Sequence, residues 1–218
     1  MLEFDDELLL ARYSPEDEDE EDEKDDKDDK GEKKAKRGMD VMSKLLKTRT
    51  ILVSKGVDDK LAASVITQLT VLESDDADKP ITIVVNSPGG SADSGFAILD
   101  YLRFVRPPVR SIVCGICASA AVMIHLGSKK GMRFCTPNSR FLLHQPSMRA
   151  QGQASDLEIL SKEIERMKEQ YNQIVADETG QTLKQVEKDV HRDFWLPAKD
   201  ALKYGLVDKV VTSRKEIE

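Results

Sequence analysis

The amino-acid sequence predicts an α/β fold with a largely parallel β-sheet. Three strand-then-helix units follow one another between residues 50 and 126, and consecutive units of this kind build parallel sheets. The strand of the second unit, residues 81–85, is an almost continuous apolar run rich in β-branched residues, which is typical of a strand covered on both faces. With 218 residues and 39% hydrophobic content, the chain has room for one sizeable core.

Cap and turn residues separate the elements of these units. Asp58 is the expected N-cap of the first helix, and two prolines at 107 and 108 end the second helix. Small residues at 115–119 are expected to form a bend between the third strand and its helix. The predicted elements are strands at 50–54, 81–85 and 110–114, and helices from 59 onward, at 93–105 and at 120–126.

The C-terminal part is predicted to be rich in helices. Ser155 and Glu158 have the spacing of a capping box, and Gly180 is placed to end the helix that they begin. The predicted elements are helices at 155–178, 182–190 and 197–203 and a closing strand at 207–211.

The acidic excess of the chain belongs to its N-terminus. Residues 1–30 hold 16 acidic and 4 basic side chains, a net charge of −12, although the whole chain carries only −7. Residues 16–30 contain twelve acids, three lysines and no apolar side chain, so they cannot bury enough surface to offset the entropy lost on ordering. We therefore expect a disordered, charged arm at 1–37 and a single folded domain at 38–218.

Composition argues against several classes of protein. The first residues carry acids where a secretory signal carries bases. The longest uncharged stretch, residues 111–128, contains glycines, serines and a histidine that suit a buried strand and helix better than lipid. Three cysteines fit a reducing compartment, and no basic helix or aromatic-basic motif favours nucleic acid. The expectation is a cytoplasmic protein that binds neither membranes nor nucleic acid.

The turn at 86–90 lies between a buried strand and a helix. Its backbone N–H groups point toward the end of the strand, where the dipole of the following helix favours negative charge. Gly89 and Gly90 would let a ligand approach the backbone closely. From these residues alone a tight turn without a ligand is the more common outcome, and no P-loop or dinucleotide-binding motif is present.

Ser119 stands at the junction between the third strand and its helix. A serine there would be exposed at the end of the sheet, and the N–H group of Ala120 would lie beside it to stabilise an oxyanion. The motif G-x-S-x-G is absent. A serine that caps the helix is therefore at least as well supported by the residues alone.

Three histidines are candidates for a general base. His125 falls within an apolar helix, which favours a buried, hydrogen-bonded role, and His191 lies in a polar stretch. His144 ends an apolar strand just before Pro146, and strand ends are where α/β proteins build their sites. His144 is the best candidate.

Cys114 and Cys117 have C-x-x-C spacing, and Cys135 is the third thiol. Tetrahedral zinc lacks ligands unless a histidine joins them, and a redox motif would need a different context. Buried cysteines that act as small apolar residues are the better interpretation, so no metal is expected.

Five sequence blocks together resemble the proteolytic subunit of the ATP-dependent Clp protease, the ClpP family of serine peptidases. The resemblance covers residues 45–211 and implies the crotonase-like ClpP fold, with stacked β-α-β units and a long handle helix. The resemblance is specific because the five blocks occur together in this order and spacing. They are VNSPGG at 85–90, GICASA at 115–120, PNSR and HQP within 137–146, QGQA at 151–154, and RD with ALKYGLV within 192–207.

The resemblance implies roles that the motifs alone leave open. Ser119 matches the nucleophile, His144 the general base and Asp193 the residue that orients this histidine. The backbone N–H groups of Gly90 and Ala120 match the oxyanion hole. The implied activity is hydrolysis of unfolded proteins and peptides by a serine endopeptidase that needs no cofactor.

The resemblance also implies an assembly of two heptameric rings, stacked as a tetradecamer around a proteolytic chamber. In the family, a strand at 151–154 and the following helix join the rings, and an AAA+ unfoldase of the Clp family docks on the ring and uses ATP. The segment before the first strand lies at the axial pore, so the acidic arm would be a gate or a removed propeptide. The matching residues are Gln151, Gly152, Gln153 and Arg192 for the ring contact and Phe104 and Phe134 for docking.

The sequence departs from the family pattern near the expected site and docking surface. Polar residues occupy 91–93 after the glycine pair, residues 147–150 lack the usual glycines and aromatic, and Thr82 and Val84 replace docking aromatics. Two alternatives therefore stay open. One is a non-catalytic or regulatory subunit that shares a mixed ring with an active ClpP paralogue. The other is a crotonase-type acyl-CoA enzyme, which the presence of all three triad positions disfavours.

Overall fold

The computed structural model describes residue 41, residues 43–147 and residues 150–217. The expected arm at 1–37 lies outside these residues. The chain divides into a unit at 1–42 and a unit at 43–218, and all strands and helices named below belong to the second unit. Among the described residues, no helix combines the length and the apolar character needed to cross a membrane.

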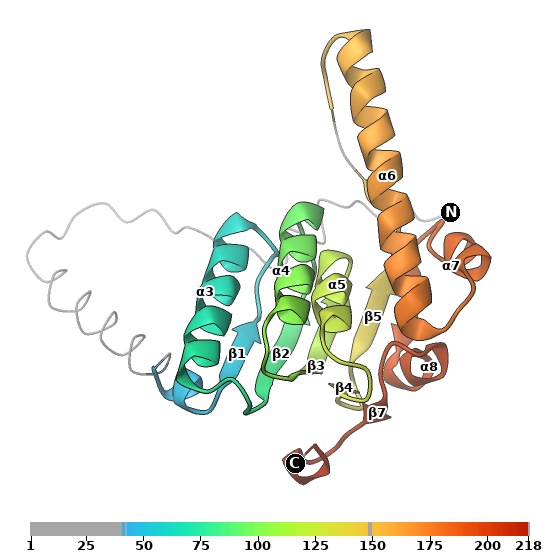
Figure 1. Cartoon of the computed structure of the whole chain (residues 1–218). Coiled ribbons are helices and arrows are strands. Elements are labelled where there is room, and N and C mark those ends of the chain that lie inside the picture. The colour runs from blue at the N-terminus through green and yellow to red at the C-terminus, as the bar shows by residue number, and fades with distance from the viewer. Residues whose placement is uncertain (1–40, 42, 148–149, 218) are drawn as a thin grey trace, which may run out of the picture. The chain divides into compact units, whose positions relative to one another are not determined.

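The second unit is built on a mixed, largely parallel sheet, which confirms the predicted α/β class (Figure 1). Five strands are parallel in the order β1-β2-β3-β4-β7, β5 adds to β3 in parallel, and β6 pairs with β5 antiparallel. The strands are β1 (Thr50–Val53), β2 (Ile81–Ser87), β3 (Val109–Ala118), β4 (Arg133–Cys135), β5 (Arg140–Leu143), β6 (Phe194–Pro197) and β7 (Lys209–Val210).

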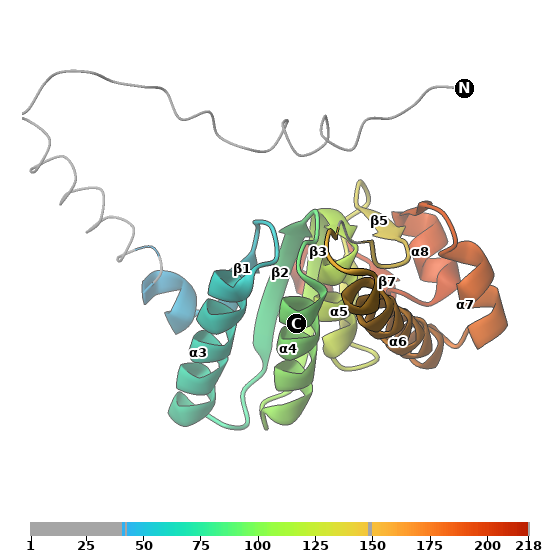
Figure 2. The same ribbon diagram turned by 90° about the horizontal axis from the view of Figure 1, so that it is seen from above.

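Three helices, α3, α4 and α5, lie side by side along one face of the sheet in both views (Figures 1 and 2). The longest helix, α6, is the predicted handle helix and projects beyond the sheet in Figure 1. The helices are α3 (Asp59–Asp75), α4 (Ala92–Phe104), α5 (Ala120–Gly127), α6 (Ala154–Thr179), α7 (Leu183–Asp189), α8 (Ala198–Tyr204) and the 3₁₀ helix η1 (Arg214–Glu216), with residues 43–47 also helical.

Two of the predicted helix caps are confirmed and one is wrong. The Asp58 carboxylate accepts a 2.7 Å hydrogen bond from the Leu61 N–H group and caps α3. Gly180 ends α6 with a positive φ of 77°. The predicted capping box of α6 is absent, because the chain is already helical at Ala154 and Ser155 lies inside the first turn.

The segment before α6 also differs from the implied handle. Residues 150–153 form no strand in the described chain. A strand at this position needs a partner for its backbone groups, and no described segment pairs with it.

β3 continues further than the sequence predicts. The residues expected to bend at 115–119 extend the strand to Ala118 through an irregularity opposite Val85 and Ser87. Gly115 adopts a φ of 99°, and the Asn86 side chain accepts a 3.1 Å hydrogen bond from the Ile116 N–H group. This bridge holds β3 beside β2 up to the residue before Ser119.

Successive side chains along each strand point to opposite faces of the sheet, and the two faces differ in burial. In β2, Ile81, Ile83 and Val85 are fully buried, as expected for the face under the helices. The opposite face carries an apolar row that crosses four strands in register. This row is Leu52, Val84, Ile112 and Phe134, of which Leu52 is 44% exposed.

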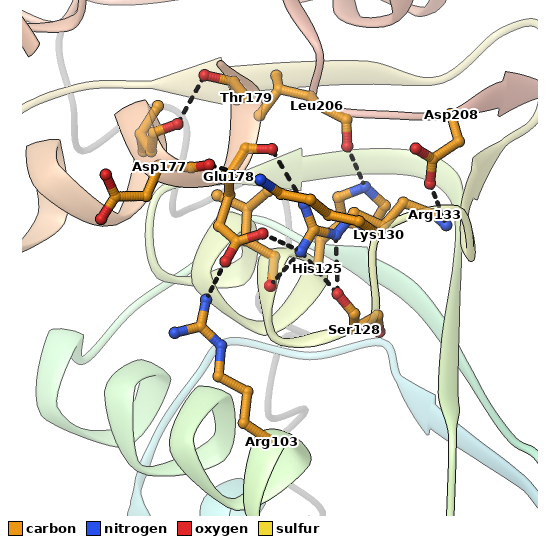
Figure 3. Close-up of polar contacts among 12 residues, drawn as sticks. Arg103, His125, Ser128, Lys130, Arg133, Asp177, Glu178, Thr179, Leu206 and Asp208 are labelled. Carbon is orange, nitrogen blue, oxygen red and sulfur yellow. Dashed lines mark hydrogen bonds and ion pairs between the residues drawn. The ribbon is translucent and has the colours of Figure 1, made fainter. Parts of the chain in front are cut away.

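A buried arginine holds the carboxyl end of α5 (Figure 3). Arg133 is 3% exposed, and its guanidinium donates to the carbonyl oxygens of Leu126 and Ser128 at 2.8 and 2.7 Å. It also pairs with the Glu178 carboxylate, which binds Arg103 at 2.8 Å. The network links α4, α5, β4 and α6, and so fixes the helix that begins just after Ser119.

Candidate active site

A cavity of about 280 Å³ lies between α4, α5, α6 and the end of β5. Ser119 and His144, the two predicted catalytic side chains from different blocks, both line it. Gly90 and Ala120 line it as well, and Asp193 does not. The structure therefore brings four of the five residues implied by the resemblance to one cavity.

The backbone at Ser119 is strained. Ser119 has φ 54° and ψ −123°, a conformation that is uncommon for residues other than glycine. Its N–H group donates to the Leu142 carbonyl at 2.9 Å, and α5 begins at the next residue. The Ser119 side chain makes no capping hydrogen bond, so the helix-capping interpretation is wrong. Strain of this kind is found where a fold holds a side chain for a functional purpose.

The two glycines of the predicted turn are required by close contacts on either side. A Cβ atom on Gly89 would lie 2.5 Å from the Ala118 carbonyl oxygen and 2.7 Å from Ser119 Cβ. A Cβ atom on Gly90 would lie 2.3 Å from the Val57 carbonyl oxygen. The turn at Gly89 and Gly90 therefore packs closely against two segments, the backbone at Ala118 and Ser119 (the Ser119 elbow) and the backbone at Val57.

Two backbone donors near Ser119 remain without acceptors in the described part of the chain. Val57 donates to the Gly89 carbonyl and accepts from Ser91 N–H, at 2.8 and 2.7 Å, but these bonds leave the Gly90 N–H group unused. The Ala120 N–H group, at the first turn of α5, likewise has no acceptor among the described residues. Both groups are available to an anionic ligand, and the dipole of α5 favours negative charge at this end.

His144 and Asp193 stand at the same end of the β5–β6 ladder, although only His144 lines the cavity. Leu143 is paired with Phe194 in the antiparallel β5–β6 ladder, and His144 and Asp193 are the next residues on the two strands. Within the described chain, the side chains of Ser119, His144 and Asp193 make no hydrogen bonds to one another.

A second serine–histidine pair lies in the core and is structural. Ser111 Oγ is 2.8 Å from His125 Nδ1. His125 Nε2 donates to the Leu206 carbonyl at 3.0 Å (Figure 3). His125 is completely buried, and desolvation, with a smaller effect of Arg133, lowers its pKa to about 3. No substrate reaches this pair, which confirms the interpretation of His125 as a core residue.

The cysteines behave as small buried residues. Cys117 and Cys135 are fully buried, and Cys114 is half-buried. Burial raises the pKa of the Cys135 thiol to about 11, so the thiolate needed for metal binding is disfavoured. In the part of the chain that the structure describes, no three His, Cys, Asp or Glu side chains gather as a metal site.

The residues implied in assembly lie on the surface. Arg192 is exposed in the turn before β6. Phe104, at the end of α4, is 77% exposed and packs with Tyr101 at a ring distance of 5.8 Å. Phe134 is half-buried on β4, within the apolar row. Gln151, Gly152 and Gln153 are all exposed before α6.

The sequence motifs do not indicate the far walls of the cavity. One wall comes from α6 through Ile164, Met167 and Tyr171, whose spacing places them on one helix face. The other comes from the first turn of α4 and includes Asp93. The spacing of apolar residues along α6 indicates that the helix face with Ile164, Met167 and Tyr171 packs against other parts of the protein. It does not indicate that this face lies across the cavity from Ser119.

Comparisons with known proteins agree with this geometry. A family model described as Clp protease matches residues 32–214. The ATP-dependent Clp protease proteolytic subunit 2 of Treponema denticola is 45% identical over 177 residues, which cover 81% of this chain and 88% of that protein. The solved structure of a point mutant of ClpP1 from Listeria monocytogenes matches with a TM-score of 0.76 and 39% identity, over 82% of this chain and 99% of that one. The chain therefore belongs to the Clp protease family, and its fold is that of ClpP.

Proposed function

We propose that this chain is the proteolytic subunit of a Clp protease and hydrolyses unfolded proteins and peptides as a serine endopeptidase. The observation that carries the proposal is the strained backbone of Ser119, which places a serine without a capping role in a cavity shared with His144. The cost of such strain, about 1–3 kcal/mol, is explained if the side chain must be exposed to substrate. Membership of the family supports the same reaction.

In the proposed reaction, His144 accepts the proton of Ser119 Oγ as the oxygen attacks a peptide carbonyl carbon. The negative charge that develops on the carbonyl oxygen is stabilised by the free N–H groups of Gly90 and Ala120. His144 then protonates the leaving amine, and water, deprotonated by the same histidine, releases the acyl group from Ser119. Asp193 holds the imidazole in the required tautomer and orientation.

The strand register supports the assignment of Asp193. Asp193 directly precedes Phe194, and His144 directly follows Leu143, the partner of Phe194, so both residues stand at the same end of the β5–β6 ladder. Catalytic hydrogen bonds are often loose in a free enzyme and shorten when substrate binds. We propose that the Ser119–His144–Asp193 hydrogen bonds form in this way.

For the assembly, we propose two stacked heptameric rings of this chain, or of this chain and a paralogue, with Gln151, Gly152, Gln153 and Arg192 at the ring contact. An AAA+ unfoldase is the proposed partner and the component that uses ATP. Two features support docking: the 77% exposure of Phe104 and the apolar row that ends at Phe134. Exposed apolar surface of this kind marks interaction sites. The three free cysteines support a location in the reducing cytoplasm.

For the acidic arm at 1–37, we propose a role as a pore gate or a removed propeptide. Its support is the net charge of −12 on residues 1–30, because seven such segments around one pore would create a strong negative field within about 8 Å at physiological salt. Deletion of residues 1–37 should change peptide entry or unfoldase binding, unless mature protein already lacks them. If neither changes and no processing occurs, the proposal fails.

Cleavage of a short fluorogenic peptide tests the proposed function, with native mass measured on the same sample. We expect a tetradecamer that cleaves the peptide and a Ser119→Ala variant of the same mass that does not. A wild-type protein that cleaves nothing alone, but restores cleavage when mixed with an active paralogue, would instead be a non-catalytic subunit. Coenzyme A binding without peptide cleavage would indicate an acyl-CoA enzyme.

A further inference from the structure

The cavity beside Ser119 has walls of different chemical character. The walls from α5 and α6 are apolar and include Met123, Ile164 and Met167. The wall from α4 is polar at its start, where Ser91 and Asp93 line the cavity. Among the lining residues that the structure describes, Asp93 supplies the single acidic side chain.

The packing of α4 against α5 brings the first turn of α4 close to the residue that follows the nucleophile. A Cβ atom on Gly95 would lie 3.0 Å from Ala120 Cβ, so the two helices meet at contact distance at this point. Ala120 directly follows Ser119, and Asp93, in the same first turn of α4 as Gly95, lines the same cavity as Ser119. Asp93 and Phe96 are three residues apart, which puts both on the helix face that lines the cavity.

The Asp93 carboxylate is available to a ligand. It is exposed, and it makes no hydrogen bond or ion pair with any residue that the structure describes. Among the residues that the structure describes, no lysine or arginine lines the cavity to neutralise it. A charged carboxylate at the edge of an apolar cavity attracts a cation and repels an anion.

We propose that Asp93 is a specificity-determining residue that selects lysine or arginine at the substrate position whose carbonyl Ser119 attacks. The aliphatic part of such a side chain would cover Met123 and Ile164, and its charged end would reach Asp93 near solvent, as lysine and arginine commonly arrange themselves. Glutamate and aspartate at this substrate position are disfavoured. The proposal rests on the proposed peptidase function and adds its substrate class.

The experiment compares peptides that differ only at this position, with lysine, the neutral isostere norleucine, or glutamate. The kcat/KM of each is measured for the wild-type protein, Asp93→Asn, Asp93→Lys and the control Asp100→Asn. Asp100 is exposed on the same helix and does not line the cavity. The lysine-to-norleucine ratio is the informative quantity, because a general loss of activity or folding changes both peptides together.

We expect this ratio to fall about five-fold in Asp93→Asn, the effect of one partly exposed ion pair, and to keep its wild-type value in Asp100→Asn. Asp93→Lys should raise the glutamate-to-norleucine ratio, and about 0.5 M salt should reduce the lysine preference of the wild-type protein. An equal lysine-to-norleucine ratio in wild type and Asp93→Asn overturns this inference alone. Cleavage of no peptide by the wild-type protein overturns the peptidase function and this inference with it.

Discussion

His144 and Asp193 are the residues that directly follow and precede the last pair of the β5–β6 ladder, Leu143 and Phe194. They come from distant parts of the chain, and the antiparallel register is what brings them together. β5 is itself held in parallel to β3, with Ala118 opposite Leu142, and Ser119 follows Ala118. The three residues of the proposed triad therefore each stand next to a strand end of one connected piece of sheet.

Replacement of Asp193 by asparagine should lower kcat for peptide hydrolysis by about 10⁴-fold, because asparagine favours the wrong histidine tautomer. The fold should be unaffected, since Asp193 is exposed and makes no hydrogen bond to another described residue. Steady-state kinetics and native mass check the prediction. Asp200→Asn removes another exposed carboxylate, on α8, and should retain activity. A drop of less than about ten-fold in Asp193→Asn would remove Asp193 from the mechanism.

Replacement of Gly89 by alanine should displace the Ser119 elbow, because the new Cβ atom would meet Ala118 O and Ser119 Cβ at 2.5 and 2.7 Å. We expect kcat/KM to fall by at least about 10²-fold, as for other small misplacements of reacting groups. Gly131→Ala is the matched control. Gly131 also has a positive φ, 85°, but an added Cβ atom would meet nothing within 4 Å, so its peptidase activity should be retained. Equal activities of the two variants would contradict the proposed role of the Gly89 contact.

The strain at Ser119 predicts an unusual order of stabilities. With φ at 54°, glycine fits this backbone better than alanine, so Ser119→Gly should have a higher free energy of unfolding than Ser119→Ala, by about 1 kcal/mol. At Ser161, an exposed position inside α6, the order should reverse, because glycine weakens a helix interior. Urea unfolding of the four variants measures both differences. If alanine is the more stable residue at position 119, the elbow is not strained.

The burial of His125 predicts a loss of stability in acid. Its folded-state pKa is lowered to about 3, against about 6.5 in an unfolded chain. Between these values only the unfolded chain binds a proton at this position, so the stability that the neutral histidine contributes is lost as the pH falls below about 6.5, by up to about 1.4 kcal/mol per pH unit.

Urea unfolding between about pH 4.5 and 7 measures this slope. His125→Asn should show a shallower dependence than the wild-type protein, by up to one bound proton. His191→Asn, which changes an exposed histidine, should retain the wild-type slope. Identical slopes for wild type and His125→Asn would mean that His125 is protonated in the folded protein.

The sequence predicts most of the fold because the apolar residues of its strand-then-helix units follow the spacing of strands and helices. The prediction is wrong where contacts with residues distant in the sequence decide the local structure. β3 runs past residue 114 because the Asn86 side chain bridges its irregularity, and no local pattern shows this contact. β4 and β6 have three and four residues, too few for a periodic signal, and they form only beside partner strands.

Some residues of the candidate site are predicted from the sequence and others are not, again because contacts between distant residues decide their positions. His144 is the best candidate for a base from local pattern alone, whereas for Ser119 the residues alone support helix capping at least as well. The structure places both at one cavity. Asp193 lies in a polar stretch without any local signal, and only the family resemblance indicates it. The α6 wall and the position of Asp93 in the cavity depend on how α4, α5 and α6 pack, which the sequence does not show.

Labelling by a fluorophosphonate, followed by mapping of the modified peptide by mass spectrometry, tests the central claim most directly. The reagent modifies a serine only when a neighbouring base activates it. We predict a single adduct on Ser119 in the wild-type protein, strongly reduced labelling in His144→Ala, and none in Ser119→Ala. An adduct that persists in Ser119→Ala, or that maps to another serine such as the buried Ser111, would contradict the assignment of Ser119 as the nucleophile.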